Sequence, residues 1–196
     1  MGVQDVVQEI MENKKIKIAT VLMIVLFMLK AQFIMSQIVP DTSINGKIFL
    51  LNVKSVKKEM GDIMSKLDDK KDLPDIYFSN KNKSQYLRMI FHPGSFKNSF
   101  SMFEVGYISP KVKVKNKLKY NTFYTERNIK LGMTKTKFLS IIGKNVKKIN
   151  IDNIYILRID EPSNSFLEMY GLPIYEAKYY FKGTILVKFL FGFKYP

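Results

Sequence analysis

The chain has 196 residues, with 32 Lys and Arg, 17 Asp and Glu, one His, no Cys and no Trp. Its 46% hydrophobic content is enough for the core of one ordinary domain or of two small ones. The lack of Cys excludes disulfides, thiolate metal sites, a cysteine nucleophile and a lipid-modified N-terminal Cys, and the single His excludes any site that needs two.

The N-terminal segment predicts export. Lys14, Lys15 and Lys17 precede an uncharged run, Ile18 to Leu29, which as a helix would rise roughly 18 Å against a bilayer core of about 30 Å. A basic stretch followed by a short apolar stretch is typical of a secretory signal peptide. Met11 begins a more typical signal sequence than Met1 does.

Two outcomes are open for this segment. Ala31 and Ser36 are each followed by Gln and offer small residues at which cleavage would release the mature chain. We therefore expect residues 1–36 to be a signal peptide, or a membrane anchor within residues 14–39 if they are not cleaved. Either outcome places the protein in the periplasm, in the cell envelope or outside the cell. The alternative is a buried hydrophobic helix of a cytosolic domain.

The first half after Pro40 reads as a strand, a helix and three more strands. Gly46–Val53 is rich in β-forming residues. Ser55 is the expected N-cap of a helix whose apolar residues, spaced for one face, are Val56, Met60, Ile63, Met64 and Leu67. The three strands that we expect next are Asp75–Ser79, Gln85–Phe91 and Phe100–Ile108.

The second half repeats this order. Leu118–Thr125 is a strand candidate, and Thr134 is the expected cap of a short helix that ends at Gly143. The strands expected after it are Asn153–Ile159, Glu176–Phe181 and Thr184–Phe193. Lys182-Gly183 suits a tight hairpin between the last two. In the last strand, alternation places Ile185, Val187, Phe189, Phe191 and Phe193 on one face.

These elements predict an α+β fold made of two tandem strand–helix–antiparallel meander units. We place the first unit at residues 41–110 and the second at residues 118–196. The basic stretch 110–117 between them is either a linker or an exposed edge strand guarded by lysines.

The stretch Ile129 to Lys144 resembles a known motif. Gly132-Met133-Thr134, followed by the apolar residues of the helix and Gly143, is similar to the Gly-Met-Thr-x-x-x-Val-x-x-x-Leu-Gly-x-Pro pattern. That pattern is found in the SmpA/OmlA (BamE-like) outer-membrane lipoproteins and in the fold-related β-lactamase-inhibitor-protein group. The resemblance implies a helical element that leads into an antiparallel meander.

The chain departs from this pattern at two points. Asn145 stands where Pro is usual, and no Cys is present to carry the lipid of the barrel-assembly lipoproteins, so a role in barrel assembly does not carry over. The Lys-, Asn-, Ile- and Phe-rich composition and the Ala31-Gln32 junction also resemble secreted proteins of Bacteroidetes-type bacteria.

Candidate catalytic residues are few. His92 is the only histidine, and Glu104 is the nearest acidic residue after it, so a constellation for acid–base chemistry is not evident. The adjacent pairs Asp68-Asp69 and Asp160-Glu161 lie next to turns, where solvated side chains are expected. No P-loop, Gly-x-Ser-x-Gly or metal-ligand spacing occurs. We therefore predict no catalytic, cofactor or metal site and a protein that is not an enzyme.

The formal net charge of +15 favours an anionic partner. Lysines concentrate in three stretches, Lys111–Lys119, Lys130–Lys137 and Lys144–Lys148. Only three of the 32 basic residues are Arg, whereas sites that read nucleic-acid bases or bind phosphate in a bidentate manner favour Arg. We expect no nucleic-acid partner, and attraction to anionic lipid headgroups or envelope polymers instead. The alternative is a general lysine bias on solvated faces.

The sequence thus predicts an exported, non-enzymatic binding or structural module of the cell envelope. Its partner would be an envelope protein or an anionic envelope surface. Sheet faces rich in aromatics would either receive that partner or form the core; the residues concerned are Tyr175, Tyr179, Tyr180 and Phe181. The alternatives are a secreted proteinaceous inhibitor of a hydrolase and an enzyme that uses His92.

Overall fold

The structure is a computed structural model that describes residues 39–63, 74–91, 99–143, 147–149, 153–161 and 163–194, together with residues 2, 20 and 23. Contacts divide the chain into Met1–Val39 and Pro40–Pro196. The signal peptide or anchor predicted for residues 1–36 lies outside the described residues, apart from those three positions. Within the described part, no helix is long and apolar enough to cross a membrane.

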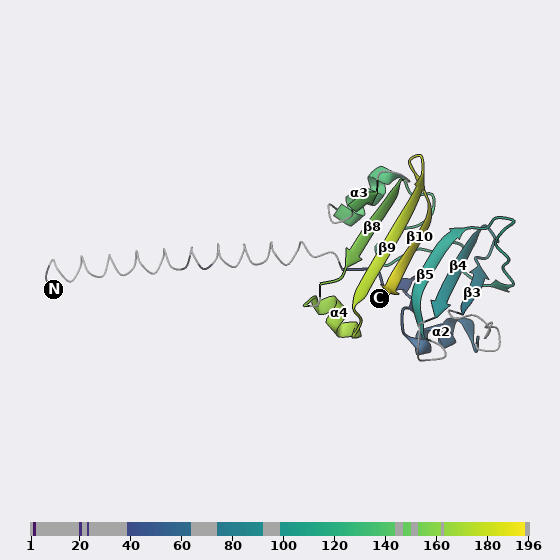
Figure 1. The fold of residues 1–196 in the computed structure, drawn as a ribbon, viewed down its shortest axis with the longest axis horizontal. Helices are drawn as coiled ribbons and strands as arrows, with labels where there is room; N and C mark the ends of the chain where they lie inside the picture. The colour runs from purple at the N-terminus through teal and green to yellow at the C-terminus, as the bar shows by residue number, and fades with distance from the viewer. Residues whose placement is uncertain are drawn as a thin grey trace. The chain divides into compact units, whose positions relative to one another are not determined.

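One eight-stranded sheet organises Pro40–Pro196, and the fold is mixed α+β with mostly strands, as predicted (Figure 1). Across the sheet the order is β6-β3-β4-β5-β10-β9-β8-β7, and every neighbouring pair is antiparallel except β6 with β3. The strands are β3 (Asp75–Ser79), β4 (Gln85–Phe91), β5 (Phe100–Tyr107), β6 (Asn116–Lys117), β7 (Lys147–Ile149), β8 (Ile154–Ile159), β9 (Ile174–Lys182) and β10 (Ile185–Lys194). β1 (Ser43–Ile44) and β2 (Ile48–Phe49) form a separate small pair.

The three strands expected in the first half are confirmed. β3 and β4 have the predicted bounds, and β5 ends one residue early, at Tyr107. Phe78, Leu87 and Val105 are opposite one another on adjacent strands and are buried. Because side chains alternate between the faces of a strand, these residues mark the inner face of the sheet.

The strand predicted at Gly46–Val53 is wrong over most of its length, because only Ile48 and Phe49 are paired. Asn45, Gly46 and Leu51 all have positive φ angles (57°, 60° and 56°), which a continuous strand does not allow. The chain therefore turns before and after β2.

The helix α2 (Val53–Met60) begins earlier than predicted. Its N-cap is Asn52, whose Oδ1 accepts a hydrogen bond from the backbone N–H of Ser55 at 2.9 Å. The predicted cap, Ser55, lies inside the first turn and accepts a hydrogen bond from the backbone N–H of Phe49 at 3.0 Å. The helix ends at Gly61, and the predicted apolar positions Met64 and Leu67 lie outside the described residues.

The strand predicted at Leu118–Thr125 is also wrong. Backbone groups of this stretch bond to two separate places. Leu118 donates to Ser79 and Tyr120 accepts from Lys81, at and just after the end of β3, while Tyr124 accepts from Asn45 in the turn between β1 and β2. A stretch that bonds to successive, separate elements satisfies its backbone without forming a ladder. For residues 110–117 the alternatives were a linker or an edge strand. The structure has an edge strand over only two of these residues, β6, which is parallel to β3.

The helix α3 (Lys135–Ile142) is confirmed with its cap and its end. The Thr134 hydroxyl accepts from the backbone N–H of Lys137 at 3.4 Å, and Gly143 ends the helix with φ 70°. Phe138 on this helix is fully buried, and its ring centroid lies 4.6 Å from that of Tyr179 on β9. The helix therefore packs on the inner face of the sheet.

The β9–β10 hairpin is confirmed, with Gly183 at φ 61° in its turn. The predicted alternation along β10 is wrong at its start, because a bulge between Leu186 and Lys188 inserts one extra residue. Leu186 is consequently buried with Phe189, while Ile185 is 37% exposed.

A third helix, α4 (Ser165–Tyr170), was not expected. It has six residues, with Asn164 as N-cap and Gly171 in the left-handed region at its end. The Phe166 ring stacks on that of Phe193, with centroids 5.7 Å apart, and the Tyr170 ring contacts it at a tilt, with centroids 4.8 Å apart. Its stability comes from these aromatic contacts, because a helix this short is marginal alone.

Candidate functional site

The aromatic residues predicted on sheet faces separate into two groups. Tyr175, Tyr179 and Phe181 are buried on the inner face, so of the two alternatives these three form the core. Tyr180 lies on the opposite face and is half-buried. Because the register connects each strand to the next, the rest of that face follows from the pairings.

We call this opposite face the outer face. Its middle row consists of the paired residues Tyr77, Arg88, Glu104, Leu190, Lys178 and Ile156. The row on one side of it holds Ile90, Met102, Gly192, Glu176 and Arg158. The row on the other side holds Tyr86, Gly106, Lys188, Tyr180 and Ile154. The helices α3 and α4 pack on the inner face, through the ring contacts of Phe138 and Phe166. The outer face therefore combines tyrosines and aliphatic side chains with charges.

Glu176 is the centre of the charge network on this face. Its carboxylate lies 2.5 Å from Lys194 Nζ, 3.0 Å from Lys178 Nζ and 3.6 Å from Arg158 Nη1. Burial alone would raise the pKa of the Glu176 carboxyl, but the ion-paired ammonium groups of Lys194 and Lys178 outweigh it, so the pKa is lowered from its ordinary 4.5. Glu176 is therefore ionised at neutral pH and holds three cations in place.

Other charges of the outer face are fixed in the same way. Arg88 Nε donates to Asp75 at 2.6 Å, and its guanidinium lies 5.6 Å from the centre of the Tyr77 ring. Lys188 Nζ lies 4.2 Å from the centre of the Tyr180 ring. Such cation–π contacts orient long side chains that otherwise move freely.

Tyr86 and Gly106 form a close contact between β4 and β5. The Tyr86 hydroxyl donates to Glu104 at 2.7 Å, and a Cβ atom placed on Gly106 would lie 2.7 Å from the Tyr86 ring. Burial first, and then the bond to Glu104, raise the pKa of the Tyr86 hydroxyl. The ring thus occupies the space that a side chain at position 106 would need.

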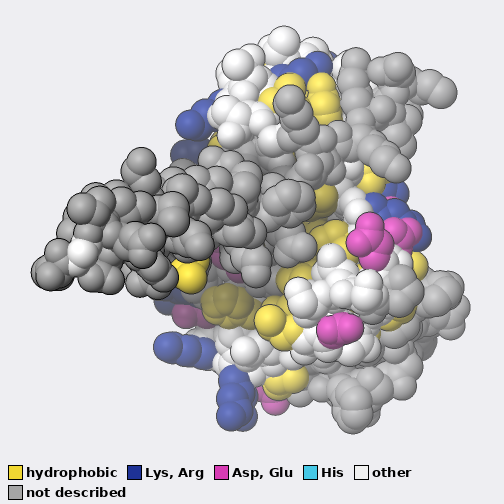
Figure 2. All heavy atoms as spheres, turned by 90° about the vertical axis from the view of Figure 1, so that its left-hand side faces the viewer, with side chains coloured by type: hydrophobic (Ala, Val, Ile, Leu, Met, Phe, Trp, Pro, Cys, Tyr) yellow, Lys and Arg dark blue, Asp and Glu magenta, His cyan; other side chains and the backbone are white. Residues whose placement is uncertain are grey.

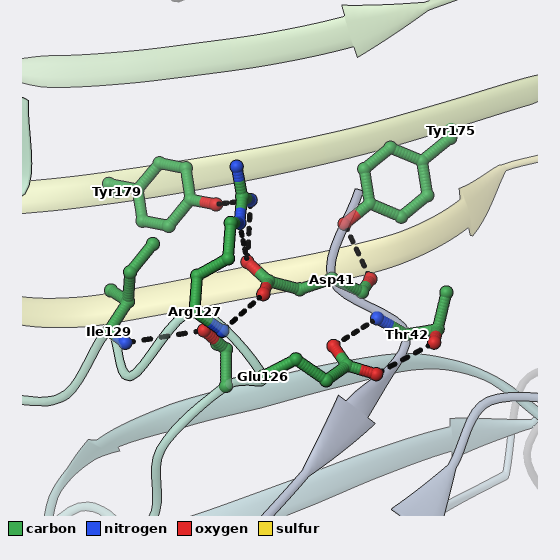
Figure 3. Close-up of polar contacts among 8 residues, drawn as sticks. Asp41, Thr42, Glu126, Arg127, Ile129, Tyr175 and Tyr179 are labelled. Atoms are coloured by element: carbon green, nitrogen blue, oxygen red, sulfur yellow. Dashed lines mark hydrogen bonds and ion pairs between the residues drawn. The ribbon is translucent and has the colours of Figure 1, made fainter. Parts of the chain in front are cut away.

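A second polar cluster lies on the inner side and connects the start of the body to the sheet (Figure 3). Asp41 accepts two hydrogen bonds from the Arg127 guanidinium, at 2.6 and 3.1 Å, and one from the Arg127 backbone N–H at 3.2 Å. The Tyr175 hydroxyl donates to the backbone carbonyl of Asp41 at 2.7 Å, and Arg127 donates to the Tyr179 hydroxyl at 3.5 Å.

This cluster is structural in character. The Asp41 side chain is fully buried and that of Arg127 is 18% exposed. Burial would lower the pKa of Arg127, but the hydrogen bond and charge of Asp41 outweigh burial and raise it. Next to the cluster, Glu126 accepts from the backbone N–H and the hydroxyl of Thr42, at 2.7 and 2.8 Å. These contacts hold residues 41–42 against the turn at 126–127.

The remaining acid–base candidates show no catalytic constellation in the described part of the chain. Glu59 is held by Tyr120 and Lys119; the hydrogen bond from Tyr120 is the main reason that the pKa of Glu59 is lowered from 4.5. Asp160 pairs with Arg158 at 2.8 Å and Glu161 is exposed. His92 and the pair Asp68-Asp69 lie outside the described residues. No group of three metal-ligating side chains occurs among the described residues.

The predicted basic stretches differ in how much of them is described. In Lys111–Lys119 every lysine is exposed, while the residues between them are half-buried or buried. Lys130 and Lys137 are exposed, and Lys135 lies 5.8 Å from the centre of the Phe181 ring. The side chains of Lys144–Lys148 lie outside the described residues. On the face drawn in Figure 2, Lys and Arg side chains project from the surface beside patches of hydrophobic side chains.

Sequence reasoning missed the outer-face pairs and the Asp41–Arg127 cluster. The residues of the cluster are 86 positions apart, and Arg158 meets Glu176 only through the register of β8 with β9. The one available signal was the rarity of Arg in a lysine-rich chain, since all three Arg residues make ion pairs.

Comparison with known proteins found no match among protein-family models, curated proteins or solved structures. The resemblance of residues 129–144 to the SmpA/OmlA and β-lactamase-inhibitor-protein groups therefore stays a prediction.

Proposed function

We propose that this chain is an exported, non-enzymatic binding module of the cell envelope, and that a partner docks on the outer face. The observation that carries this proposal is the arrangement of that face: tyrosines and aliphatic side chains lie between charges that are already held by ion pairs or rings. Tyr and Arg are enriched in protein interfaces. Charges that are fixed before binding lose less conformational entropy when the partner arrives.

The charge of the outer face indicates the kind of partner. The described part of this face has six cations: Arg88, Arg158, Lys178, Lys182, Lys188 and Lys194. Its carboxylates are those of Asp75, Glu104 and Glu176, together with that of Asp160, which pairs with Arg158 just after β8. The excess of positive charge favours a protein partner with a moderately acidic surface. An envelope protein with such a surface fits this chemistry.

Site-specific photo-crosslinking in living cells tests the docking surface. A photoreactive residue placed at Lys178 or Tyr180 should give an adduct with one protein, while the same residue at Leu139 or Met169, which are exposed on α3 and α4, should give none. Equal adducts from all four positions, or none from the outer face, would refute the proposal. An adduct with a hydrolase would support the inhibitor alternative instead.

Export is part of the same proposal. The described body begins with Pro40 and Asp41, both buried, so cleavage after Ala31 or Ser36 would remove the N-terminal segment without cutting the body. Cell fractionation and the mass of the mature chain test this. An N-terminus at Gln32 or Gln37 indicates cleavage, and an intact chain in the membrane fraction indicates an anchor. An intact chain in the cytosol would exclude export.

We further propose that the body is a duplicated unit, with copies at residues 41–110 and 118–196. In each half a helix precedes a meander, β3-β4-β5 after α2 and β8-β9-β10 after α3, and the last strands of the two meanders pair. Co-expression of residues 40–110 and 111–196 as separate chains tests the arrangement. The halves should bind each other, because β5–β10 pairing and the Asp41–Arg127 cluster both connect them. Stable, separate halves would contradict it.

A further inference from the structure

A row of lysines lies along the β6 edge of the sheet. It consists of Lys111, Lys113, Lys115, Lys117 and Lys119, which are all exposed. The residues between them are half-buried, and Leu118 is buried. Lys111 lies in the turn that the Val112 N–H closes on Ser109, and Lys117 lies in β6. Exposed lysines alternate with less exposed residues along the whole segment, so the lysines share its exposed side. We call these five residues the lysine row.

Within the described residues, most of this charge has no acidic partner. Lys119 is the one member of the row that pairs with a described carboxylate, that of Glu59 at 3.3 Å. Lys81 and Lys83, in the turn between β3 and β4, are exposed close to the row; the backbone N–H of Lys81 bonds to Tyr120. The turn thus adds positive charge beside the row.

A small hollow adjoins the lysine row. It has a volume of about 200 Å³, and its lining includes Lys83, Lys115 and Lys117 with the aliphatic side chains of Ile108, Val112 and Val114. Cationic groups line a hollow whose other walls are partly apolar. This combination suits a repeating unit that has one anionic group and a less polar linking portion.

We propose that the lysine row binds a linear polyanion, a polymer whose phosphate or carboxylate groups repeat along a single chain. A line of charges at a sheet edge matches a chain better than it matches the plane of a bilayer. Residues 108–119 also expose no large hydrophobic side chain that would insert into lipid. Because an ammonium group is a point charge without the fixed fork of a guanidinium, the row would recognise charge spacing and not the identity of the polymer unit.

The salt dependence of binding tests this site on the full chain. A single-stranded oligothymidylate serves as a linear phosphodiester probe, for which the slope of log K against log salt is about −0.7 for each phosphate contact. Five lysines in contact would give a slope of roughly −3.5. The double variant Lys113→Ala/Lys115→Ala should make the slope shallower by about 1.4.

The matched control is Lys130→Ala/Lys137→Ala, which removes the same charge from exposed positions before and in α3, a helix that packs on β8 and β9 and not at the β6 edge. It should leave the slope close to that of the unmodified chain. Equal changes in both variants would mean that overall charge, and not the lysine row, binds the probe, and this would overturn the proposal. Circular dichroism of each variant confirms that it is folded.

Two further probes identify the chemistry of the ligand. Polyglutamate of matched charge number distinguishes carboxylate from phosphate as the preferred group, and binding of either polymer that depends on Lys113 and Lys115 supports the site. Vesicles that contain an anionic lipid provide the opposing arm. If the chain bound the vesicles through Lys113 and Lys115 but bound neither polymer, the ligand would be a membrane surface, and the proposal of a linear polyanion would be wrong. The outer face takes no part in these tests, so failure of one proposal leaves the other intact.

Discussion

At the scale of single residues, the pair of Asp41 and Arg127 makes the strongest prediction. Replacing Asp41 with Ala leaves a mostly buried guanidinium without its carboxylate, which typically costs about 3 to 5 kcal/mol in the free energy of unfolding. Urea denaturation measures this loss. The control Glu126→Gln alters the more exposed contact with Thr42 and should cost less than about 1 kcal/mol. A loss at Asp41 as small as that of the control would show that the cluster does not stabilise the body.

Gly106 makes a second prediction at this scale. Replacing it with Ala places a Cβ atom 2.7 Å from the Tyr86 ring, so the ring must move and its hydrogen bond to Glu104 breaks. We expect a loss of about 1 to 3 kcal/mol in the free energy of unfolding. The same substitution in a Tyr86→Leu background should cost clearly less, since the ring is gone. Strictly additive losses in this cycle would contradict the contact.

At the scale of elements, the helix α3 shows which features are local. The Thr134 side chain satisfies one orphan N–H of the first turn, so Thr134→Ala should cost about 0.5 to 2 kcal/mol. Thr134→Ser keeps the hydroxyl and should restore most of that loss, while Thr136→Ala, at an exposed position of the same helix, should have little effect. Thermal unfolding followed by circular dichroism measures all three, and an equal loss in Thr134→Ala and Thr136→Ala would exclude the cap.

The elements that the sequence predicted correctly are those whose signals are local. Thr134, Gly143 and Gly183 act through their own neighbours, and both elements that they delimit, α3 and the β9–β10 hairpin, were predicted from the sequence. Asn52 was overlooked because Ser55 is an equally good cap by residue type, and only the turn after β2 decides between them. Local signals specify elements whose hydrogen bonds are local.

Long-range bonds explain the elements that were wrong or missed. The bulge in β10 interrupts the regular pairing with β9 just after Leu186. The backbone of Leu186 bonds instead to Gly132 and Met133, more than fifty residues away. The predicted strand at Leu118–Thr125 likewise bonds to distant elements. The outer face needs the register of six strands at once. Periodicity within one strand indicates that a face exists but not which residues of other strands share it.

At the scale of the whole molecule, the response to acid follows from Glu176 and the surrounding cations. Because the pKa of Glu176 is lowered in the folded state, the unfolded chain takes up its proton more readily than the folded chain does. The stabilisation is therefore fully present above about pH 4.5, the ordinary value for Glu, and is lost as pH falls through the lower folded value. Glu59, whose pKa is also lowered, adds to the same trend.

The variant Glu176→Gln tests this argument. At pH 7 it leaves Lys178, Lys194 and Arg158 without their carboxylate, and we expect a loss of about 1 to 3 kcal/mol in the free energy of unfolding. As the pH falls below 4.5 the unfolded chain takes up the proton first, and the native carboxyl follows at its lower pKa, so the difference between the two proteins should shrink. Urea denaturation at several pH values between 7 and 3 measures it, with Glu161→Gln in the exposed segment after β8 as the control. A difference that stays constant over this range would show that Glu176 stabilises the sheet by packing and not by charge, and the outer face would then lack the fixed cations on which its binding role depends.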